Sequence, residues 1–419
     1  MNRLHVKYSI RILVLMCGLC GSVYTASASP LTITDYMLIA DKNNPDIAYL
    51  RGGVAVAGEE VSYAEQQYLP TPSISASEDN RSRRIITASL KQPLWTGGRL
   101  TAATEYAENK QSATAHQLNE TRLNTFISVT QQWQRWLAAS EKSSISARTL
   151  TRYHEYRELI SRRIEGGRSS QSDLTLIDSR IAQAQEDYER AEMEQASSLS
   201  QLSQLTGTAV TSDNLSHSAL YSPVSRELSQ TVVDAVMHAP TVLRYEKEAD
   251  AAKSESLRDK STMYPEVSVI VSSDKAGNYS PDGERIMLNV SLTPGAGLSA
   301  LSRYQSSQLK VLQAADQTRQ AKLRLTNIIS DLIIRQNNAI TRLPVSQQRI
   351  TSSDEVMKSY TRQFEYGQKT WNDLVNALRE LSASELDYAE LDAQMKADEI
   401  QLQLYTLGPD FIFGHNNGK

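Results

Sequence analysis

Residues 162–174 have the sequence RRIEGGRSSQSDL, and residues 362–374 have the sequence RQFEYGQKTWNDL. Both stretches place a glycine six positions before an aspartate, and the two copies lie about 200 residues apart. Further matching pairs follow at the same spacing: Leu174 with Leu374, Ile177 with Ala377, Ile181 with Leu381, Ala184 with Ser384, Tyr188 with Tyr388 and Ala191 with Leu391. A long repeat of this kind indicates two copies of one structural unit.

Other landmarks recur at similar offsets. They are Asn44-Pro45-Asp46-Ile47 with Ala239-Pro240-Thr241-Val242, Leu69-Pro70 with Tyr264-Pro265, and Leu205-Thr206-Gly207 with Thr406-Leu407-Gly408. Two such halves favour a pseudo-symmetric body over the single asymmetric cleft of an enzyme. The predicted divisions are a leader (1–28), a first repeat (29–210), a second repeat (211–408) and a C-terminal tail (409–419).

The N-terminus has the pattern of a secretory signal peptide. Three basic residues precede and enter an apolar run at 12–19, and Ala26-Ser27-Ala28 is a small-residue cleavage site. The run is short for a membrane anchor. Cys20 lacks the small preceding residue that a lipoprotein needs, because Leu19 stands there. Both cysteines, Cys17 and Cys20, lie in this leader, so we expect a mature chain without disulfides, thiolate metal sites or a cysteine nucleophile.

Composition limits the partners. The chain has 44 basic and 48 acidic residues, and three of the basic residues leave with the leader. A negative mature chain argues against nucleic-acid binding, which requires a basic footprint. The five histidines outside the leader, His116, His154, His217, His238 and His415, are scattered and suggest surface positions. No metal or other cofactor is predicted.

Each repeat contains a predicted β-hairpin. Apolar residues alternate with serine and threonine in 72–78 and 85–92, and again in 267–271 and 286–292. The polar loop 79–83 joins the first pair, and 274–283 joins the second. Runs of this length fit tilted membrane-spanning strands, although a small soluble hairpin fits the alternation equally well.

A glycine-containing joint follows each hairpin, QPLWTGGRL at 92–100 and TPGAGLSALSR at 293–303, with Gly97, Gly98, Gly295 and Gly297 as its glycines. A helix is predicted over 100–163, roughly 96 Å long at 1.5 Å per residue. Its heptad stripe, Phe126, Val129, Trp133 and Trp136, needs lateral partners. The chain then turns at Gly166-Gly167 and returns through 173–205.

The helix lengths explain how the halves combine. Segments 31–68, broken at Asn44-Pro45, and 170–205 together equal one long helix in length. Each half therefore supplies one hairpin and two staves, where a stave is a column of helix that spans the full length of the helical body. Four strands cannot close a barrel, and an open edge is not viable in lipid. Two chains give an eight-stranded barrel, and side chains fill the interior of a barrel of that size. Three chains give twelve strands and twelve staves, so a conduit favours the trimer. Pro344, inside the second long helix, predicts a local kink or a loosened turn between residues 340 and 344.

On the double repeat, the joint QPLWTGGRL and the two paired turns, the chain resembles the TolC family of outer-membrane channel proteins over almost all of its mature length. The resemblance implies a mainly α fold with a small transmembrane β part: a homotrimer with a 12-stranded β-barrel, four strands per chain, in outer-membrane lipid and a long α-helical barrel in the periplasm. The second joint, TPGAGLSALSR, is closer to the type I secretion branch that exports large adhesins than to the drug-efflux branch.

The resemblance also implies roles for the helical tips. Gly166, Gly167 and Gly367 are expected at the turns that dock a periplasmic adaptor protein and face an inner-membrane ABC transporter. In the family an Asp on the first turn bonds a Tyr and an Arg beside the second turn. Asp173 matches the Asp, but Phe364 and Lys369 occupy the other two positions, and Lys369 could pair with Asp173 more loosely. Asp373 matches one ring of a constriction, whereas Asn376 occupies the second ring position.

Alternatives remain at several positions. Gly167 and Gly367 can serve only as helix C-caps, and Asp173 and Asp373 only as residues favoured at helix N-termini. Multidrug efflux is the alternative to secretion, and a periplasmic coiled-coil scaffold is the alternative to a channel.

Residues 295–300, GAGLSA, match a dinucleotide fingerprint. The second strand that a Rossmann unit requires is missing, because 301–340 predicts unbroken helix. The protein is therefore not expected to be an enzyme.

Overall fold

The computed structural model describes residues 30–78, 84–218, 226–276 and 283–410. The predicted leader, the tip of each hairpin loop and most of the predicted tail lie outside these residues. The first repeat contains α1 (Ile33–Asn43), α2 (Pro45–Gln66), β1 (Thr71–Glu78), β2 (Arg84–Trp95), α3 (Arg99–Glu165), α4 (Gln171–Thr206) and the short helix η1 (Ser212–Asn214). The second contains α5 (Leu228–His238), α6 (Pro240–Ser261), β3 (Glu266–Ala276), β4 (Gly283–Ser291), η2 (Ala296–Leu298), α7 (Ser299–Glu365) and α8 (Trp371–Leu407).

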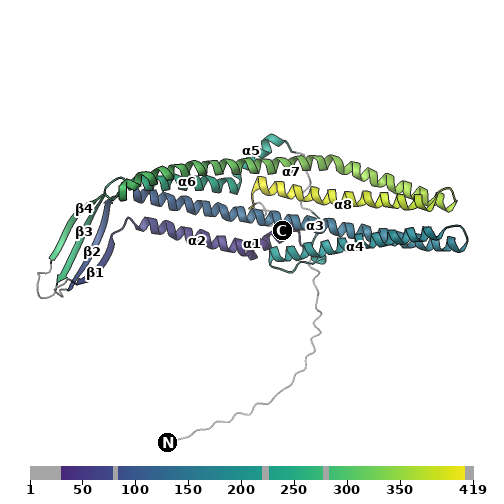
Figure 1. Cartoon of the computed structure of the whole chain (residues 1–419), viewed down its shortest axis with the longest axis horizontal. Helices are drawn as coiled ribbons and strands as arrows, with labels where there is room; N and C mark the ends of the chain where they lie inside the picture. The colour runs from purple at the N-terminus through teal and green to yellow at the C-terminus, as the bar shows by residue number, and fades with distance from the viewer. Residues whose placement is uncertain (1–29, 79–83, 219–225, 277–282, 411–419) are drawn as a thin grey trace, which may run out of the picture.

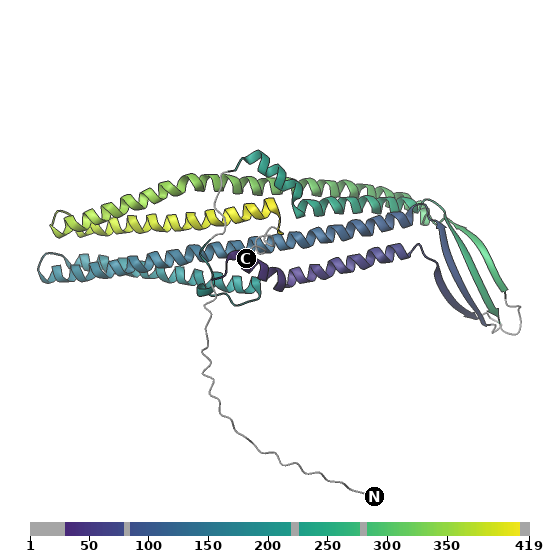
Figure 2. The same ribbon diagram turned by 180° about the vertical axis from the view of Figure 1, so that it is seen from behind.

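The elements form an elongated rod with the sheet at one end and two helical turns at the other (Figure 1). α3 and α7, each of 67 residues, run the full length of the helical part. In the half next to the sheet, the helices lie side by side in the order α2, α3, α6, α7; in the other half the order is α4, α3, α8, α7. Figure 2 shows the same order from behind. Among the described helices, none is both long and apolar enough to cross a membrane.

The α1–α2 segment is stacked end to end with α4, as the predicted helix lengths indicated. Asn44 caps α2 through hydrogen bonds that its side chain accepts from Asp46 and Ile47. The amide groups of Asn43 and Asn44 donate to the backbone oxygens of Thr206 (3.1 Å) and Leu205 (3.4 Å), at the end of α4. These bonds satisfy carbonyls that the end of α4 leaves unpaired, and they join the α1–α2 segment and α4 into one stave.

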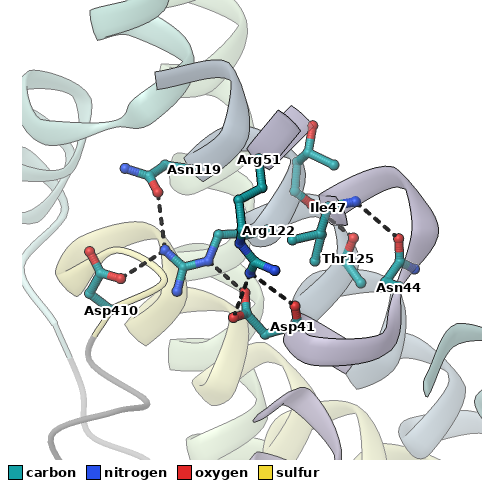
Figure 3. Close-up of polar contacts among 9 residues, drawn as sticks. Asp41, Asn44, Ile47, Arg51, Asn119, Arg122, Thr125 and Asp410 are labelled. Atoms are coloured by element: carbon teal, nitrogen blue, oxygen red, sulfur yellow. Dashed lines mark hydrogen bonds and ion pairs between the residues drawn. The ribbon is translucent and has the colours of Figure 1, made fainter. Parts of the chain in front are cut away.

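A nearly buried arginine links several helices beside this break between α1 and α2 (Figure 3). Arg122 of α3 donates to Asp41 at the end of α1 (2.6 Å) and to Asp410 after α8 (2.9 Å). Its side chain is 11% exposed, and that of Asp41 is 10% exposed. Arg51 of α2 also reaches Asp41 (3.5 Å). One guanidinium therefore ties the broken stave, the central helix and the C-terminal end together.

The main hydrophobic core lies close to this level. The predicted heptad stripe is buried in it, with Phe126, Val129, Trp133 and Trp136 all at 0% exposure. The indole groups of Trp133 and Trp136 donate to the Ser216 oxygen (3.0 Å) and the Ser212 hydroxyl (3.2 Å). The tryptophans thereby bury their rings and hold the segment after α4 against α3.

The four strands form one antiparallel sheet in the order β1-β2-β3-β4. Residues that face each other across such a sheet share a face, so the register assigns the faces. One face is mainly apolar, with Ile74, Ile86, Leu90, Val267, Val269, Val271, Ile286, Leu288 and Val290. The other carries Ser73, Ser75, Thr87, Ser89, Lys91, Ser272, Asp274, Arg285 and Asn289. β1 and β4 are the sheet edges.

Three boundaries differ in detail from the sequence expectations. β2 continues to Trp95, with an irregularity between Pro93 and Trp95, so the first half of QPLWTGGRL is strand and not joint. β3 and β4 include Asp274 and Gly283, which shortens the second loop. α7 continues as one helix through Pro344, and the kink or loosened turn expected between residues 340 and 344 stays a prediction. A groove of about 560 Å³ lies beside it, between α7 and α8.

Candidate functional site

The two helical turns at the end of the rod have the same backbone geometry. The Gly167 N–H donates to the Ile164 oxygen (2.9 Å), and the Arg168 N–H donates to the Arg163 oxygen (2.7 Å). The matching bonds at the second turn join Gly367 to Phe364 (3.1 Å) and Gln368 to Gln363 (2.9 Å). This is the Schellman arrangement, which needs a left-handed residue after the helix. Gly167 and Gly367 supply it with φ values of 68° and 74°.

Each return helix begins with a capping box. The Asp173 carboxylate accepts a hydrogen bond from the Ser170 N–H (2.9 Å), and the Asp173 N–H donates to the Ser170 hydroxyl (3.3 Å). Asp373 and Thr370 repeat this exchange at the start of α8 (2.9 and 3.3 Å). Both aspartates therefore have the capping role that was the alternative to a pore role. The pKa of Asp173 lies below its ordinary value, and the hydrogen bond from the backbone N–H of Ser170 is the largest cause.

Asp173 has a second partner that joins the two turns. The Trp371 indole N–H donates to the free oxygen of the Asp173 carboxylate at 2.9 Å. Trp371 is the first residue of α8 and is buried at 8% exposure, in a cluster that includes Leu374, Ile177 and Phe364. A single side chain thus packs in the shared core of the two hairpins and holds the carboxylate of the opposite hairpin.

The residues at the Tyr and Arg positions of the family contact other groups. Phe364 is buried, and the Arg163 guanidinium lies over its ring, 4.4 Å from the centroid. The Lys369 ammonium lies over the Tyr360 ring at 4.2 Å. The possible Lys369–Asp173 pair is therefore replaced by a Trp371–Asp173 hydrogen bond and a second cation–π contact. Phe364 still bridges the hairpins, through Arg163.

Asp373 and Asn376 remain at the surface of α8. Asn376 is exposed, and the Asp373 carboxylate also accepts a hydrogen bond from the Thr370 hydroxyl (2.7 Å). The hydroxyl and the backbone N–H of Thr370, together with the nearby Lys369 charge, lower the pKa of Asp373. Asp373 is therefore a fixed negative charge at the tip.

The predicted hairpin joints lie at the other end of the rod. Gly97, Gly98, Gly295 and Gly297 all have positive φ. A Cβ at Gly97 would lie 2.7 Å from the Cβ of Tyr264, so that position also needs a residue without a side chain. Trp95 stacks edge-on against Tyr264 at 6.4 Å. These contacts fix the angle at which the sheet meets the helices.

Sequence reasoning did not identify Trp371. The repeat offers a signal, because Gln171 occupies the matching position of the first half, while the capping pairs Ser170/Thr370 and Asp173/Asp373 on either side correspond. An unmatched aromatic residue at the start of a capped helix indicates a contact that only one repeat makes.

Among the residues that the structure describes, no group of three His, Cys, Asp or Glu side chains is placed to hold a metal ion.

Comparison with known proteins finds a partial family match, a distant relative and similar folds. Residues 39–208 match the family model "Outer membrane efflux protein". The chain is 21% identical to the outer membrane efflux protein BepC of Brucella suis, over 94% of this chain and 92% of BepC. The outer membrane protein VceC of Vibrio cholerae superposes with a TM-score of 0.78 at 13% identity, covering 90% of this chain and 96% of VceC.

The CmeC outer membrane channel of Campylobacter jejuni superposes with a TM-score of 0.75 at 13% identity. The match covers 98% of this chain and 94% of CmeC. The fold is therefore shared with these outer membrane channel structures over 90% and 98% of this chain: a long helical body with a four-stranded sheet at one end.

Proposed function

We propose that this chain, a TolC-like outer membrane factor, is the passive conduit of a three-part export machine. The chain belongs to the outer membrane, and its helical body extends into the periplasm. In the proposed machine an inner-membrane ABC transporter supplies the energy, a periplasmic adaptor docks at the helical tips, and three copies of the chain enclose the path of the cargo.

The observation that carries the proposal is the pair of open sheet edges. β1 and β4 are each paired on one side only, and an unpaired strand edge is not viable within lipid. β1 and β4 run in opposite directions, so β4 of one chain can pair with β1 of the next and keep the antiparallel alternation. Three chains then close twelve strands, with the apolar face toward lipid and the polar face toward the interior.

The helical tips are the proposed entrance. Gly166, Gly167 and Gly367 form the exposed turns for the adaptor. Asp173 is held by Trp371, whereas Phe364 and Lys369 make cation–π contacts with Arg163 and Tyr360. Asp373 and Asn376 lie near the start of α8. Three copies of Asp373 around a narrow axis would form a ring of carboxylates that favours cations.

The proposed cargo is protein, because the joint TPGAGLSALSR resembles that of the adhesin-exporting type I branch. Small-molecule efflux is the second candidate, favoured by the family description and by the name of BepC. A chromosomal deletion complemented with the intact chain separates them. Loss of one large protein from the outside of the cells, with unchanged drug sensitivity, supports secretion. The converse result contradicts it, and no change in either assay contradicts the conduit.

Trimer formation has its own test. Detergent extraction followed by mass determination is expected to give a particle of three chains. A protein that remains in solution as a monomer without detergent would contradict the channel assignment.

A further inference from the structure

We propose that a polar cavity among α3, α4 and α8 binds a compact inorganic oxyanion, of the phosphate or sulfate type, between two arginines. The cavity has a volume of about 130 Å³. It lies in the half of the rod away from the sheet, where α3 runs between α4 and α8 (Figure 1). Sites for drug-sized ligands measure about 300–1,000 Å³, so this cavity suits a small ion. The inference does not depend on the proposed conduit.

Two guanidinium groups reach the cavity from the two flanking helices. Arg180 belongs to α4, and Arg379 belongs to α8. Among the described residues, neither arginine forms an ion pair with a carboxylate, whereas Arg157 in the same region pairs with Asp178 at 2.6 Å. Two unpaired cations beside one cavity repel each other. An anion between them removes this repulsion.

The Arg180 side chain also has a buried donor that is not used. Its Nη1 group donates to the Gln183 side-chain oxygen at 3.1 Å. Its Nε–H, in contrast, is shielded from solvent and has no hydrogen-bond partner among the described residues. Native proteins rarely bury a donor without an acceptor, because the lost hydration is not replaced. The Nε–H therefore points to an acceptor that the chain itself does not supply.

Hydroxyl groups line the cavity on the α3 side. Tyr153 is 4% exposed and Ser146 is 5% exposed. Neither hydroxyl has a hydrogen-bond partner within the described ranges, although buried tyrosine hydroxyls usually have one. The Thr149 hydroxyl donates to the Ser382 hydroxyl at 3.1 Å and holds α3 against α8 here. Several donors without acceptors thus surround one small space.

The charge around the cavity is positive on balance. One acidic residue, Asp187 of α4, also lines it, but its carboxylate accepts a hydrogen bond from Arg190 at 3.4 Å. The pKa of Tyr153 reflects the balance. Burial raises this pKa, Arg180 and Arg379 lower it, and Asp187 raises it by less than either arginine lowers it. Both guanidinium groups therefore act on the same hydroxyl more strongly than the carboxylate does.

A tetrahedral oxyanion matches this set of groups. Guanidinium groups bind phosphate oxygens through paired N–H donors, and each hydroxyl can donate one further hydrogen bond. A chloride ion lacks the separate acceptor atoms that these donors require. A bound oxyanion would join α4 to α8. The two helical hairpins would then be linked at a second level, nearer the sheet than the Trp371–Asp173 bond.

Titration calorimetry of the full-length chain in detergent tests the site, with inorganic phosphate as the probe at constant ionic strength. Phosphate and sulfate are expected to bind, and chloride is not. Arg180→Gln and Arg379→Gln are each expected to weaken phosphate binding on the order of tenfold, as the loss of a charge-assisted hydrogen bond does. Asp187→Asn is expected to tighten binding, because it removes the opposing charge.

A gentler variant keeps the test valid if an arginine change disturbs folding. Tyr153→Phe retains the buried ring and removes only the hydroxyl, so phosphate binding is expected to weaken about two- to tenfold. Arg349→Gln is the control, because Arg349 already pairs with Asp387 at 2.6 Å and lines a different groove. Its affinity for phosphate is expected to equal that of the native chain.

Hydrogen exchange locates the bound ion. Phosphate is expected to slow exchange of the amides at 176–188 and 376–388 in the native chain. Phosphate and sulfate also stabilise proteins by exclusion from their surfaces, so the slowing must disappear in Arg180→Gln and Arg379→Gln.

Three results would overturn the proposal. They are phosphate binding that survives in both arginine variants, chloride binding of equal strength, and acetate binding at least as tight as that of phosphate. The acetate result would assign the site to carboxylates, such as an acidic side chain of a partner protein. None of these measurements involves transport, so failure of the conduit proposal would leave them unchanged.

Discussion

The indole N–H of Trp371 donates to the carboxylate of Asp173 at 2.9 Å, across 198 residues of sequence. The bond joins the first residue of α8 to the first turn of α4, so it links the two helical hairpins of one chain at their tips. Asp173 uses its other oxygen to cap its own helix. The carboxylate is thereby held at two points, and separation of the hairpins at the tip must break the Trp371 bond.

Trp371→Phe is therefore expected to open the tip. Phenylalanine keeps most of the buried ring but lacks the N–H, so only the bond to Asp173 is lost. A hydrogen bond to a charged group contributes about 1.5–3 kcal/mol when buried, and the partial exposure of Asp173 lowers this. We expect a higher single-channel conductance or a larger open fraction in reconstituted trimers.

Lys369→Gln is the matched control for that experiment. It removes a tip cation that contacts Tyr360 and not Asp173, so the conductance is expected to change little. Equal opening in both variants would show that loss of packing or charge at the tip, and not the Trp371 bond, controls the channel.

The sequence predicts the repeated elements because their signals are local. Gly167 and Gly367 mark turns that need positive φ, Phe126 to Trp136 mark a buried helical stripe, and Asn44-Pro45 marks a helix break. The structure confirms each of these. Local chemistry also explains the small errors, since Pro93 and Trp95 stay in β2 by means of an irregularity in the pairing.

Contacts between distant segments were not predictable in the same way. Asp173 was identified as a tip residue, but its partner depends on how the two hairpins are placed side by side, which no periodicity encodes. The same holds for the Arg122 cluster and for Glu399, a buried carboxylate of α8 that binds Arg226 at 2.6 Å. These charges look like surface residues in a helical pattern and are buried only by the packing of other helices.

Gly167→Ala is expected to destabilise the tip, whereas Gly166→Ala is not. Gly167 has φ of 68°, and a Cβ there meets nothing within 4 Å, so the cost is the left-handed backbone alone, about 1–2 kcal/mol. Gly166 has φ of −83°, which any residue adopts. Hydrogen exchange of the amides at 160–175 measures the difference. Binding of a purified adaptor to the Gly167→Ala variant and to the native chain then tests docking. Equal protection in the two variants would contradict the Schellman account.

Arg122→Met is expected to lower the stability of the whole chain. It leaves Asp41 nearly buried, with Arg51 as its remaining basic contact, and it releases Asp410. Removing one partner of a buried pair costs roughly 3–5 kcal/mol, less here because Arg51 compensates. Arg51→Met, at a side chain that is 53% exposed, is the control with a small expected effect. Thermal unfolding in detergent compares them, and a larger effect at Arg51 would reverse the assigned importance.

Asp398 of α8 is expected to make stability depend on pH. It is 0% exposed, and one of its oxygens accepts no hydrogen bond among the described residues. Burial raises the pKa of Asp398 to about 6, against the opposing effects of Arg335 and Gln394, and Asp331 adds to the rise. The folded chain thus holds this proton to a higher pH than the unfolded chain does.

The cost of burying the Asp398 charge is therefore largest above about pH 6 and disappears as the pH falls toward 4. Asp398→Asn is expected to raise the free energy of unfolding at pH 8 by about 1–3 kcal/mol, at about 1.4 kcal/mol per pKa unit, and to have little effect near pH 4. Asp387→Asn, at an exposed aspartate of the same helix, is the control. A constant difference between Asp398→Asn and the native chain across this range would contradict the assignment.

Asp373 distinguishes a pore residue from a cap. Three copies near a narrow axis would concentrate cations, so Asp373→Ala is expected to reduce cation selectivity and block by multivalent cations, and Asn376→Asp to increase both. The capping box alone predicts something else: Asp373→Ala lowers thermal stability, while Asn376→Asp, outside the box, leaves it unchanged. Single-channel recordings beside unfolding curves separate the two roles. If Asp373→Ala lowers stability and leaves selectivity intact, the capping box is the whole function of this residue and the ring assignment is wrong.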